Sequence, residues 1–218
     1  MRKGISALGA MSAWMMFVLL TSCEKEGTGQ PDTAAPTTRT VTDLVADTII
    51  GMSSIGQPYG SGRYTLYSLE RNIVVPSSDS ASDKWDLGFR GTTIITNSGN
   101  SGPGKGGAFV LTGLFDELKS VPADSTFRID NAPSSYAIPA GSNRGWYVYN
   151  APANLITPIP GRVLVVRTAT GRFAKVEILN YYKGGVTPAV GASDDEKLRR
   201  QRYFTFRYTY QPNGTATF

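Results

Sequence analysis

The chain has 218 residues, enough for one sizeable domain, and a formal net charge of +5. It contains no histidine and one cysteine, which excludes Ser-His-Asp and Cys-His nucleophiles, histidine or cysteine zinc sites, internal disulfides and cysteine-bound iron–sulfur clusters. Because so much enzyme chemistry lacks its residues, we expect a protein that is not an enzyme. The 24 glycines, 13 prolines and 11% aromatic residues favour many short strands joined by turns.

Residues 1–22 are typical of a bacterial lipoprotein signal peptide. Arg2 and Lys3 precede an apolar run that is too short to span a membrane comfortably. The run ends in the sequence LTSC, which resembles a lipobox, and this resemblance implies cleavage before Cys23 and acylation of that residue. A lipidated Cys23 would hold the protein at a membrane without a transmembrane helix. The alternative is a core cysteine that happens to follow an apolar segment.

Residues 23–40 are predicted to be the lipidated cysteine and a flexible tether. Gly, Thr, Pro, Asp and Ala dominate this stretch, and large apolar side chains are almost absent. Its acidic start, residues 24–26, is similar to the signal that sends some lipoproteins to the outer face of an outer membrane. We therefore expect a lipid-anchored outer-membrane protein, exposed at the cell surface or facing the periplasm.

Residues 41–218 are predicted to form one antiparallel all-β domain, either a sandwich or an open barrel. A turn at Ala169 to Gly171 is expected to join two of its strands into a hairpin. Only two brief helices are expected, at 114–119 and 194–200. Apolar runs and alternation predict the strands, which are 63–69, 72–75, 84–96, 107–111, 145–149, 162–167, 173–179 and 203–210.

Basic residues gather at 197–202, directly after the acidic residues Asp194, Asp195 and Glu196. A nucleic-acid surface requires an uninterrupted basic face with interleaved aromatic residues. The alternation of charge favours a solvated turn, so no nucleic-acid partner is expected.

The glycine-rich segment 96–107 has one feature of a phosphate-binding loop. Gly99 and the pair Gly104-Lys105 stand at the G-x-x-x-x-G-K spacing. Gly106, however, occupies the position of the magnesium-binding hydroxyl, and a strand follows where a helix is required. A long, tight loop between two strands is therefore the favoured interpretation, with no metal site.

Two further sets of residues are candidates for chemistry. A pair of carboxylates could catalyse glycoside hydrolysis, and the candidates are Asp83, Asp86, Asp116 and Glu117. For Asp86, a surface or edge position is the favoured interpretation. Tyrosines could form a stacking surface for a flat ligand, although aromatic residues in strands more often belong to the core. These are Tyr136, Tyr147, Tyr149, Tyr181 and Tyr182.

Several segments, taken in order behind the lipoprotein signal, resemble the HmuY-like haem-binding lipoproteins. The glycine loop at 97–107 and the hairpin at 171–176 are the most specific; the others are 84–89, 121–124, 145–146, 162–167 and 204–210. The resemblance covers roughly residues 41–211 and implies an all-β fold. It also implies a carrier that takes haem from host haemoproteins and passes it to an outer-membrane receptor.

This chain departs from the family at the haem ligands. The resemblance implies two axial side chains, usually histidine or methionine, whereas this chain has no histidine and only Met52 as a methionine after the signal peptide. The interval 125–144, where one family ligand lies in a hairpin, is short, and Asn150 or Ala151 stands at the other ligand position. Paired histidine ligation is therefore excluded, and paired methionine ligation is not expected.

Tyrosinate ligation of ferric haem is the remaining hypothesis, with Tyr149 and Tyr136 as the candidate ligands. Arg144 and Arg162 are candidate partners for the two haem propionates. The alternative is a non-catalytic surface binding or interaction module that kept the fold and lost haem ligation. In that case Tyr149 is simply a strand residue and both arginines are surface charges.

Overall fold

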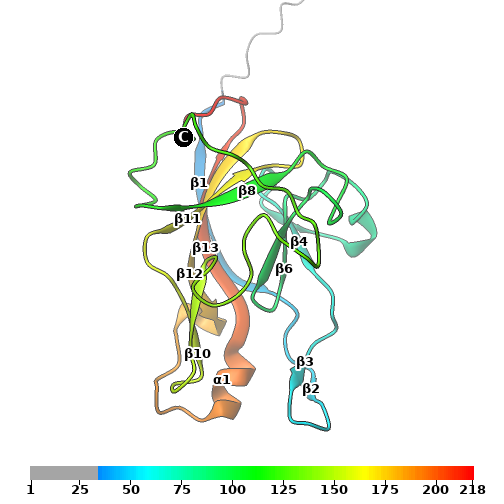
Figure 1. Ribbon diagram of the computed structural model, residues 1–218, viewed down its shortest axis with the longest axis vertical. Helices are drawn as coiled ribbons and strands as arrows, with labels where there is room; N and C mark the ends of the chain where they lie inside the picture. Colours follow the sequence, from blue (N-terminus) through cyan, green and yellow to red (C-terminus); the bar gives the residue numbers. More distant parts are fainter. Residues whose placement is uncertain (1–33) are drawn as a thin grey trace, which may run out of the picture. The chain divides into compact units, whose positions relative to one another are not determined.

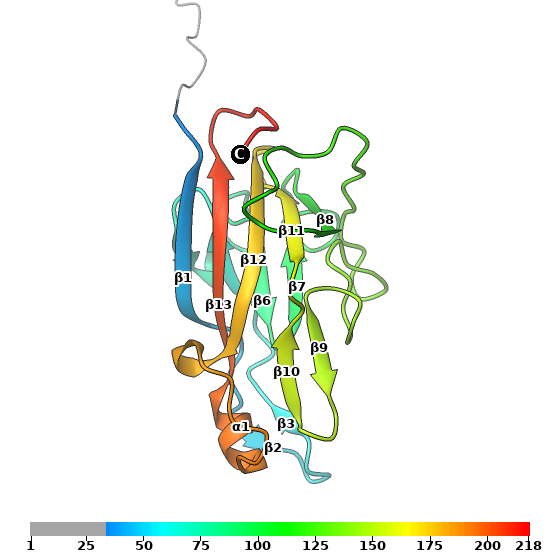
Figure 2. The ribbon, with the colours of Figure 1, turned by 90° about the vertical axis from the view of Figure 1, so that its left-hand side faces the viewer.

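Two antiparallel sheets face each other in the computed structural model, which describes residues 34–218 (Figure 1). The predicted signal peptide, Cys23 and most of the predicted tether lie outside the described residues. The larger sheet has the order β1-β13-β12-β11-β8, and Figure 2 shows its strands side by side. These strands are Thr37–Val45, Gln201–Gln211, Phe173–Tyr182, Arg162–Arg167 and Gly107–Thr112.

The smaller sheet has the order β5-β4-β6-β7, and two short hairpins complete the strands. The sheet strands are Ile73–Val75, Thr65–Ser68, Leu87–Arg90 and Thr93–Thr96. The hairpins are β2-β3 and β9-β10, with the bounds Gly51–Met52, Pro58–Tyr59, Tyr147–Asn150 and Leu155–Pro158. Helical segments are α1 and the 3-10 turns η1 and η2, with the bounds Asp194–Arg200, Ser77–Asp79 and Lys183–Gly185.

Aromatic side chains from both sheets meet in the main core. Phe89 of β6 stacks on Phe206 of β13 with 5.5 Å between ring centroids, and it lies 5.0 Å from the ring of Phe204. Burying aromatic rings in this way supplies much of the apolar stabilisation of a two-layer fold. The predicted antiparallel sandwich is therefore confirmed, and the two sheets do not close into a barrel.

The outer faces of both sheets are also covered. Val163 and Val165 on the outer face of β11 pack under Phe115, with the C-terminal Phe218 beside them. The outer face of the smaller sheet packs around Trp85, whose indole nitrogen donates to the Ser80 carbonyl at 3.0 Å. Residues between β8 and β9 therefore pack against the outer faces of the sandwich.

All eight predicted strand regions contain strands, and the region 84–96 is divided into β6 and β7 by a turn with Gly91 at φ 54°. The predicted helix at 194–200 is confirmed as α1, and Ser193 caps it by accepting from the Glu196 N–H at 3.2 Å. The predicted helix at 114–119 is wrong, because that segment forms turns. Strand β1 begins at Thr37, so the last residues of the expected tether are paired with β13.

The surface or edge position expected for Asp86 is wrong. Its side chain is buried, with Oδ2 accepting from the Leu69 N–H at 2.8 Å and Oδ1 accepting from the Ala169 N–H at 2.9 Å. The carboxylate therefore joins the smaller sheet to the β11–β12 turn. Burial raises the pKa of Asp86 to about 6, and the two backbone donors only partly oppose this rise.

The glycine-rich loop connects β7 to β8, as the sequence indicates, and it is organised around Asn97. The Asn97 amide donates to the carbonyls of Ser82 and Trp85, each at 2.8 Å, while its oxygen accepts from the Gly104 N–H at 2.8 Å. A Cβ on Gly106 would come within 2.5 Å of the Asn97 carbonyl oxygen. The glycines at this point therefore serve close backbone packing.

No helix within residues 34–218 has the length and apolar character needed to cross a membrane.

Candidate functional site

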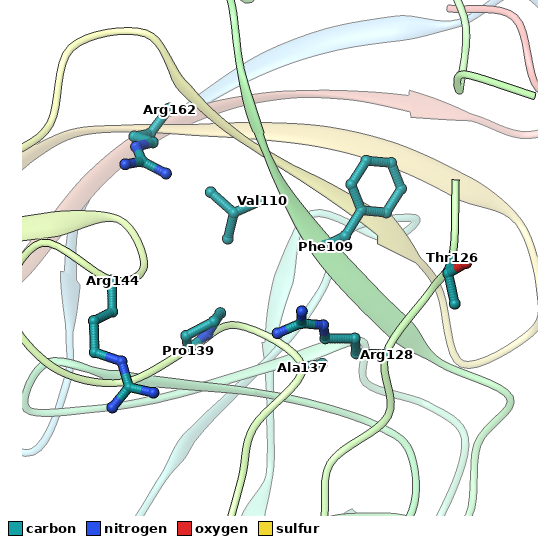
Figure 3. A pocket seen from close by; sticks show the side chains of 8 residues that line it. All are labelled: Phe109, Val110, Thr126, Arg128, Ala137, Pro139, Arg144 and Arg162. Atoms are coloured by element: carbon teal, nitrogen blue, oxygen red, sulfur yellow. The ribbon is translucent and has the colours of Figure 1, made fainter. Parts of the chain in front are cut away.

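A cationic hollow lies beside β8, where three arginines from separate parts of the chain surround an apolar floor (Figure 3). We call it the arginine hollow, and its volume is about 340 Å³. It is lined by Phe109, Val110, Thr126, Arg128, Ala137, Pro139, Arg144 and Arg162. No aspartate or glutamate is among these residues, so its walls carry positive charge only.

Backbone contacts fix the position of each arginine. Arg128 forms a bridge with Ala108 of β8, with hydrogen bonds of 3.0 Å in both directions. Arg144 ends a tight turn whose closure requires Gly145, because a Cβ there would overlap the Pro139 carbonyl oxygen. Arg162 begins β11 directly after Gly161, which has a φ of 72°, and its N–H donates to the Ile159 carbonyl at 3.2 Å.

None of the three guanidinium groups has an ion pair or hydrogen bond within residues 34–218. By contrast, Arg207, elsewhere in the molecule, is paired with two carboxylates, that of Glu177 at 2.6 Å and that of Asp116 at 3.1 Å. Like charges brought together without counter-ions favour the binding of an anion. Guanidinium groups also match the planar geometry of carboxylates and phosphates.

A second hollow of about 300 Å³ adjoins the first and shares Arg128, Pro139 and Arg144 with it. Tyr136 lines this second hollow, together with Ser134, Ser135, Pro133 and Ala140. The Tyr136 ring also packs against the cluster around Trp85, close to Tyr64. Burial raises the pKa of Tyr64 to about 12, and the neighbouring Tyr136 adds to this rise.

The four predicted site residues are therefore placed differently. Arg144 and Arg162 line the same hollow, and Tyr136 lines the adjoining one. Tyr149 lines neither hollow; its N–H donates to Ser142 Oγ at 2.8 Å, and its hydroxyl lies 3.2 Å from the Asn154 side-chain oxygen. Sequence reasoning missed Arg128, which occupies the junction of the two hollows.

Five of the other sequence candidates have structural roles. Tyr147, Tyr181 and Tyr182 are buried in the main core around Trp146, which confirms the favoured interpretation of these aromatic residues. Asp86 binds backbone N–H groups, whereas Asp116 pairs with Arg207. No cluster of three or more potential metal-ligating residues occurs in the described part of the chain.

The basic residues of α1 are engaged locally. Lys197 is buried and donates to the carbonyls of Ala153 and Val190, each at 2.8 Å. Arg199 pairs with Asp195 at 3.0 Å, and Arg200 pairs with Glu196 at 3.4 Å. These charges offset one another, in contrast to those of the arginine hollow.

Fold and site together define an all-β domain of two facing antiparallel sheets with a cationic hollow beside an edge strand. The family model described as HmuY protein matches residues 61–191, and the chain belongs to this family. The matched region includes all three arginines of the hollow. HmuY proteins are a family of binding proteins.

Solved structures of an HmuY analog and of an HmuY-like protein are similar to this chain at low sequence identity. The apo HmuY analog of Tannerella forsythia is 15% identical, with a TM-score of 0.48 over 83% of this chain and 99% of that chain. A Bacteroides vulgatus protein described as HmuY-like and haem-binding is 13% identical, with a TM-score of 0.44 over 79% of this chain and 90% of that chain. No curated protein matches the chain.

Proposed function

We propose that this protein is an exported, lipid-anchored carrier that binds haem or a related anionic ligand at the cell envelope, without catalysis. The observation that carries the proposal is the set of three unpaired arginines around one hollow. Arg144 and Arg162 are suited to the propionates of haem, and Arg128 adds a third guanidinium group. Family membership makes haem the first ligand to test.

The apolar floor supports a ligand that has both a charged end and an apolar body. Val110 of β8 and Pro139 stand between the guanidinium groups in Figure 3, and Phe109 lies to one side of them. Covering such side chains contributes roughly 25 cal/mol per Å² of apolar surface buried. A porphyrin with two carboxylates has this combination of groups, whereas an inorganic anion has only the charge.

The walls of the arginine hollow provide no side chain that ligates haem iron. The residues that line the arginine hollow include no histidine, methionine, tyrosine or carboxylate side chain. Tyr136 in the adjoining hollow is therefore favoured over Tyr149 as the tyrosinate ligand. The lack of an iron ligand in the arginine hollow also supports a second candidate function, a binding or interaction module that kept the fold and lost haem ligation.

A haemin titration of residues 24–218, followed by the Soret band, tests the proposal. We expect a saturable shift to a ferric, high-spin spectrum, with slightly weaker binding after reduction because tyrosinate prefers Fe(III). Replacing both Arg144 and Arg162 by glutamine is expected to weaken binding at least about tenfold, or roughly 1.4 kcal/mol. A titration without any shift beyond a protein-free blank would leave only the interaction module.

Tyr136→Phe isolates iron ligation from burial, because it removes one oxygen and keeps the ring. We expect this variant to lose the tyrosinate features of the ferric spectrum, and Tyr149→Phe to retain them. If Tyr149→Phe alone changes the spectrum, the ligand assignment is reversed. If neither variant changes it, tyrosinate ligation is rejected, and with it the predicted preference for ferric haem.

The membrane anchor has a separate test. A Cys23→Ala variant of the full chain is expected to lose acylation and to leave the membrane fraction, because the lipid chains supply roughly 0.8 kcal/mol per buried methylene. Labelling with a fatty-acid analogue and cell fractionation report the two effects. A variant that still fractionates like the parent would contradict the anchor, and the outer-membrane position proposed here would then need another basis.

A further inference from the structure

The arginine hollow has the groups to recognise carboxylates and lacks the groups to recognise iron. We infer that it is a dicarboxylate site, and that this chain binds a metal-free porphyrin dicarboxylate about as tightly as it binds haemin. This inference rests on the proposed function and specifies its ligand class. It also assigns to Arg128 a part in ligand selection.

The first support is the number and isolation of the positive charges. Arg128, Arg144 and Arg162 have no acidic partner within the described chain, and each offers up to five N–H donors. One carboxylate accepts two parallel hydrogen bonds from one guanidinium group, so three arginines can hold two carboxylates. A single carboxylate would leave part of the repulsion between the arginines unrelieved.

The second support is the arrangement of the two hollows. Arg128 and Arg144 line both of them, so two of the three charged groups lie where the two volumes adjoin. Volumes of about 340 and 300 Å³ each stand near the lower end for small-molecule sites. A ligand that carries two acids along one edge can therefore place them near this junction and extend its apolar body into an adjoining hollow.

The third support is the absence of soft or nitrogen ligands from these walls. Met52 is the only methionine in residues 34–218, and it lies on the exposed β2-β3 hairpin, outside both linings. Tyr136, which lines only the second hollow, is partly buried against the cluster around Trp85. Most of the binding free energy is therefore assigned to the carboxylates and to apolar contact, which do not require the metal.

The test compares three ligands by quenching of tryptophan fluorescence on residues 24–218. These are haemin, metal-free protoporphyrin IX and the dimethyl ester of protoporphyrin IX, which lacks both negative charges. We expect the metal-free acid to bind within about threefold of haemin and the ester to bind at least tenfold more weakly. Raising the salt concentration should weaken the two acids and leave the ester nearly unchanged.

Arg128→Gln is expected to weaken both acids by the same factor, about tenfold, and to leave the ester unchanged. Arg63→Gln serves as the matched control, because Arg63 is an exposed arginine outside both hollows and its loss changes the net charge equally. An equal loss in both variants would show a general charge effect and overturn the assignment of Arg128.

The outcomes separate this inference from the proposed function. If haemin binds and metal-free porphyrin binds more than tenfold more weakly, the inference is wrong and haem carriage stands. If the ester binds as tightly as the acid, apolar contact alone drives binding and the dicarboxylate site is rejected. If none of the three binds, the proposed function and this inference both fail.

Discussion

Lowering the pH from 7 to 4 is expected to stabilise this protein by about 2 kcal/mol relative to its Asp86→Asn variant. Burial raises the pKa of Asp86 to about 6, against an ordinary value of 3.8. The folded protein therefore holds the Asp86 proton more tightly than the unfolded chain, so its stability falls as pH rises from about 4 to 6. One pKa unit corresponds to about 1.4 kcal/mol, which sets an upper limit of about 3 kcal/mol for the full transition.

Urea unfolding of both proteins at pH 4, 5, 6 and 7 measures this effect. The variant serves as the reference because it keeps the shape of the side chain and cannot ionise. Ion pairs such as that between Glu177 and Arg207 are present in both proteins, so their pH dependence cancels in the difference. A difference that does not change with pH would mean that the Asp86 carboxyl has an ordinary pKa in the folded state.

Asp86 also shows why burial was harder to predict than secondary structure. The pattern Trp85 to Phe89 correctly predicts a strand, because apolar side chains recur at every second residue. The two N–H donors of the carboxylate come from Leu69 and Ala169, which are remote in sequence. Nothing within the strand itself indicates that such partners exist.

The missed strand β1 and the wrong helix have identifiable causes. Strand β1 is an edge strand rich in threonine, with Leu44 as its one fully buried side chain, so its sequence has the composition of a tether. In the segment 114–119, the carbonyls of Phe115 and Leu118 accept hydrogen bonds from the Lys175 ammonium, each at 2.8 Å. Tertiary contacts of this kind override a weak local helix preference.

The candidate site could be predicted only in part. Arg144 and Arg162 are predicted from the sequence as partners for haem propionates, and the structure brings both to one hollow; their role in binding stays a prediction. Arg128 was missed because its position depends on the bridge to Ala108. Tyr136 lines the second hollow and Tyr149 lines neither hollow. This difference depends on loop packing, which the alternation of side chains along a strand does not indicate.

Gly99→Ala is expected to lower the free energy of unfolding by more than about 3 kcal/mol, the largest single-residue effect that we predict. Gly99 has a φ of 57°, and a Cβ there would overlap the backbone carbonyl oxygen of Asp130. Left-handed geometry costs about 1 kcal/mol for alanine, and overpacking adds about 1–3 kcal/mol or more. For a chain of this length, the expected loss corresponds to a fall in Tm of roughly 6–12 °C.

Asp130 has little freedom to move away from the new methyl group. Its carboxylate accepts from the Thr96 N–H at 2.9 Å and the Ala137 N–H at 2.7 Å, and its own N–H donates to Ser98 Oγ at 3.1 Å. Ala137 also lines the arginine hollow, so displacement of Asp130 is expected to weaken ligand binding as well as stability.

Gly171→Ala is the matched control, because Gly171 has a φ of 88° and no atom within 4 Å of the added Cβ. It carries the same kind of backbone strain without the overlap, so we expect a loss of only about 1 kcal/mol and unchanged ligand binding. Thermal unfolding followed by circular dichroism compares the two variants directly. Equal losses would mean that the Gly99 loop relaxes around a methyl group, and that close packing against Asp130 does not hold the wall of the hollow in place.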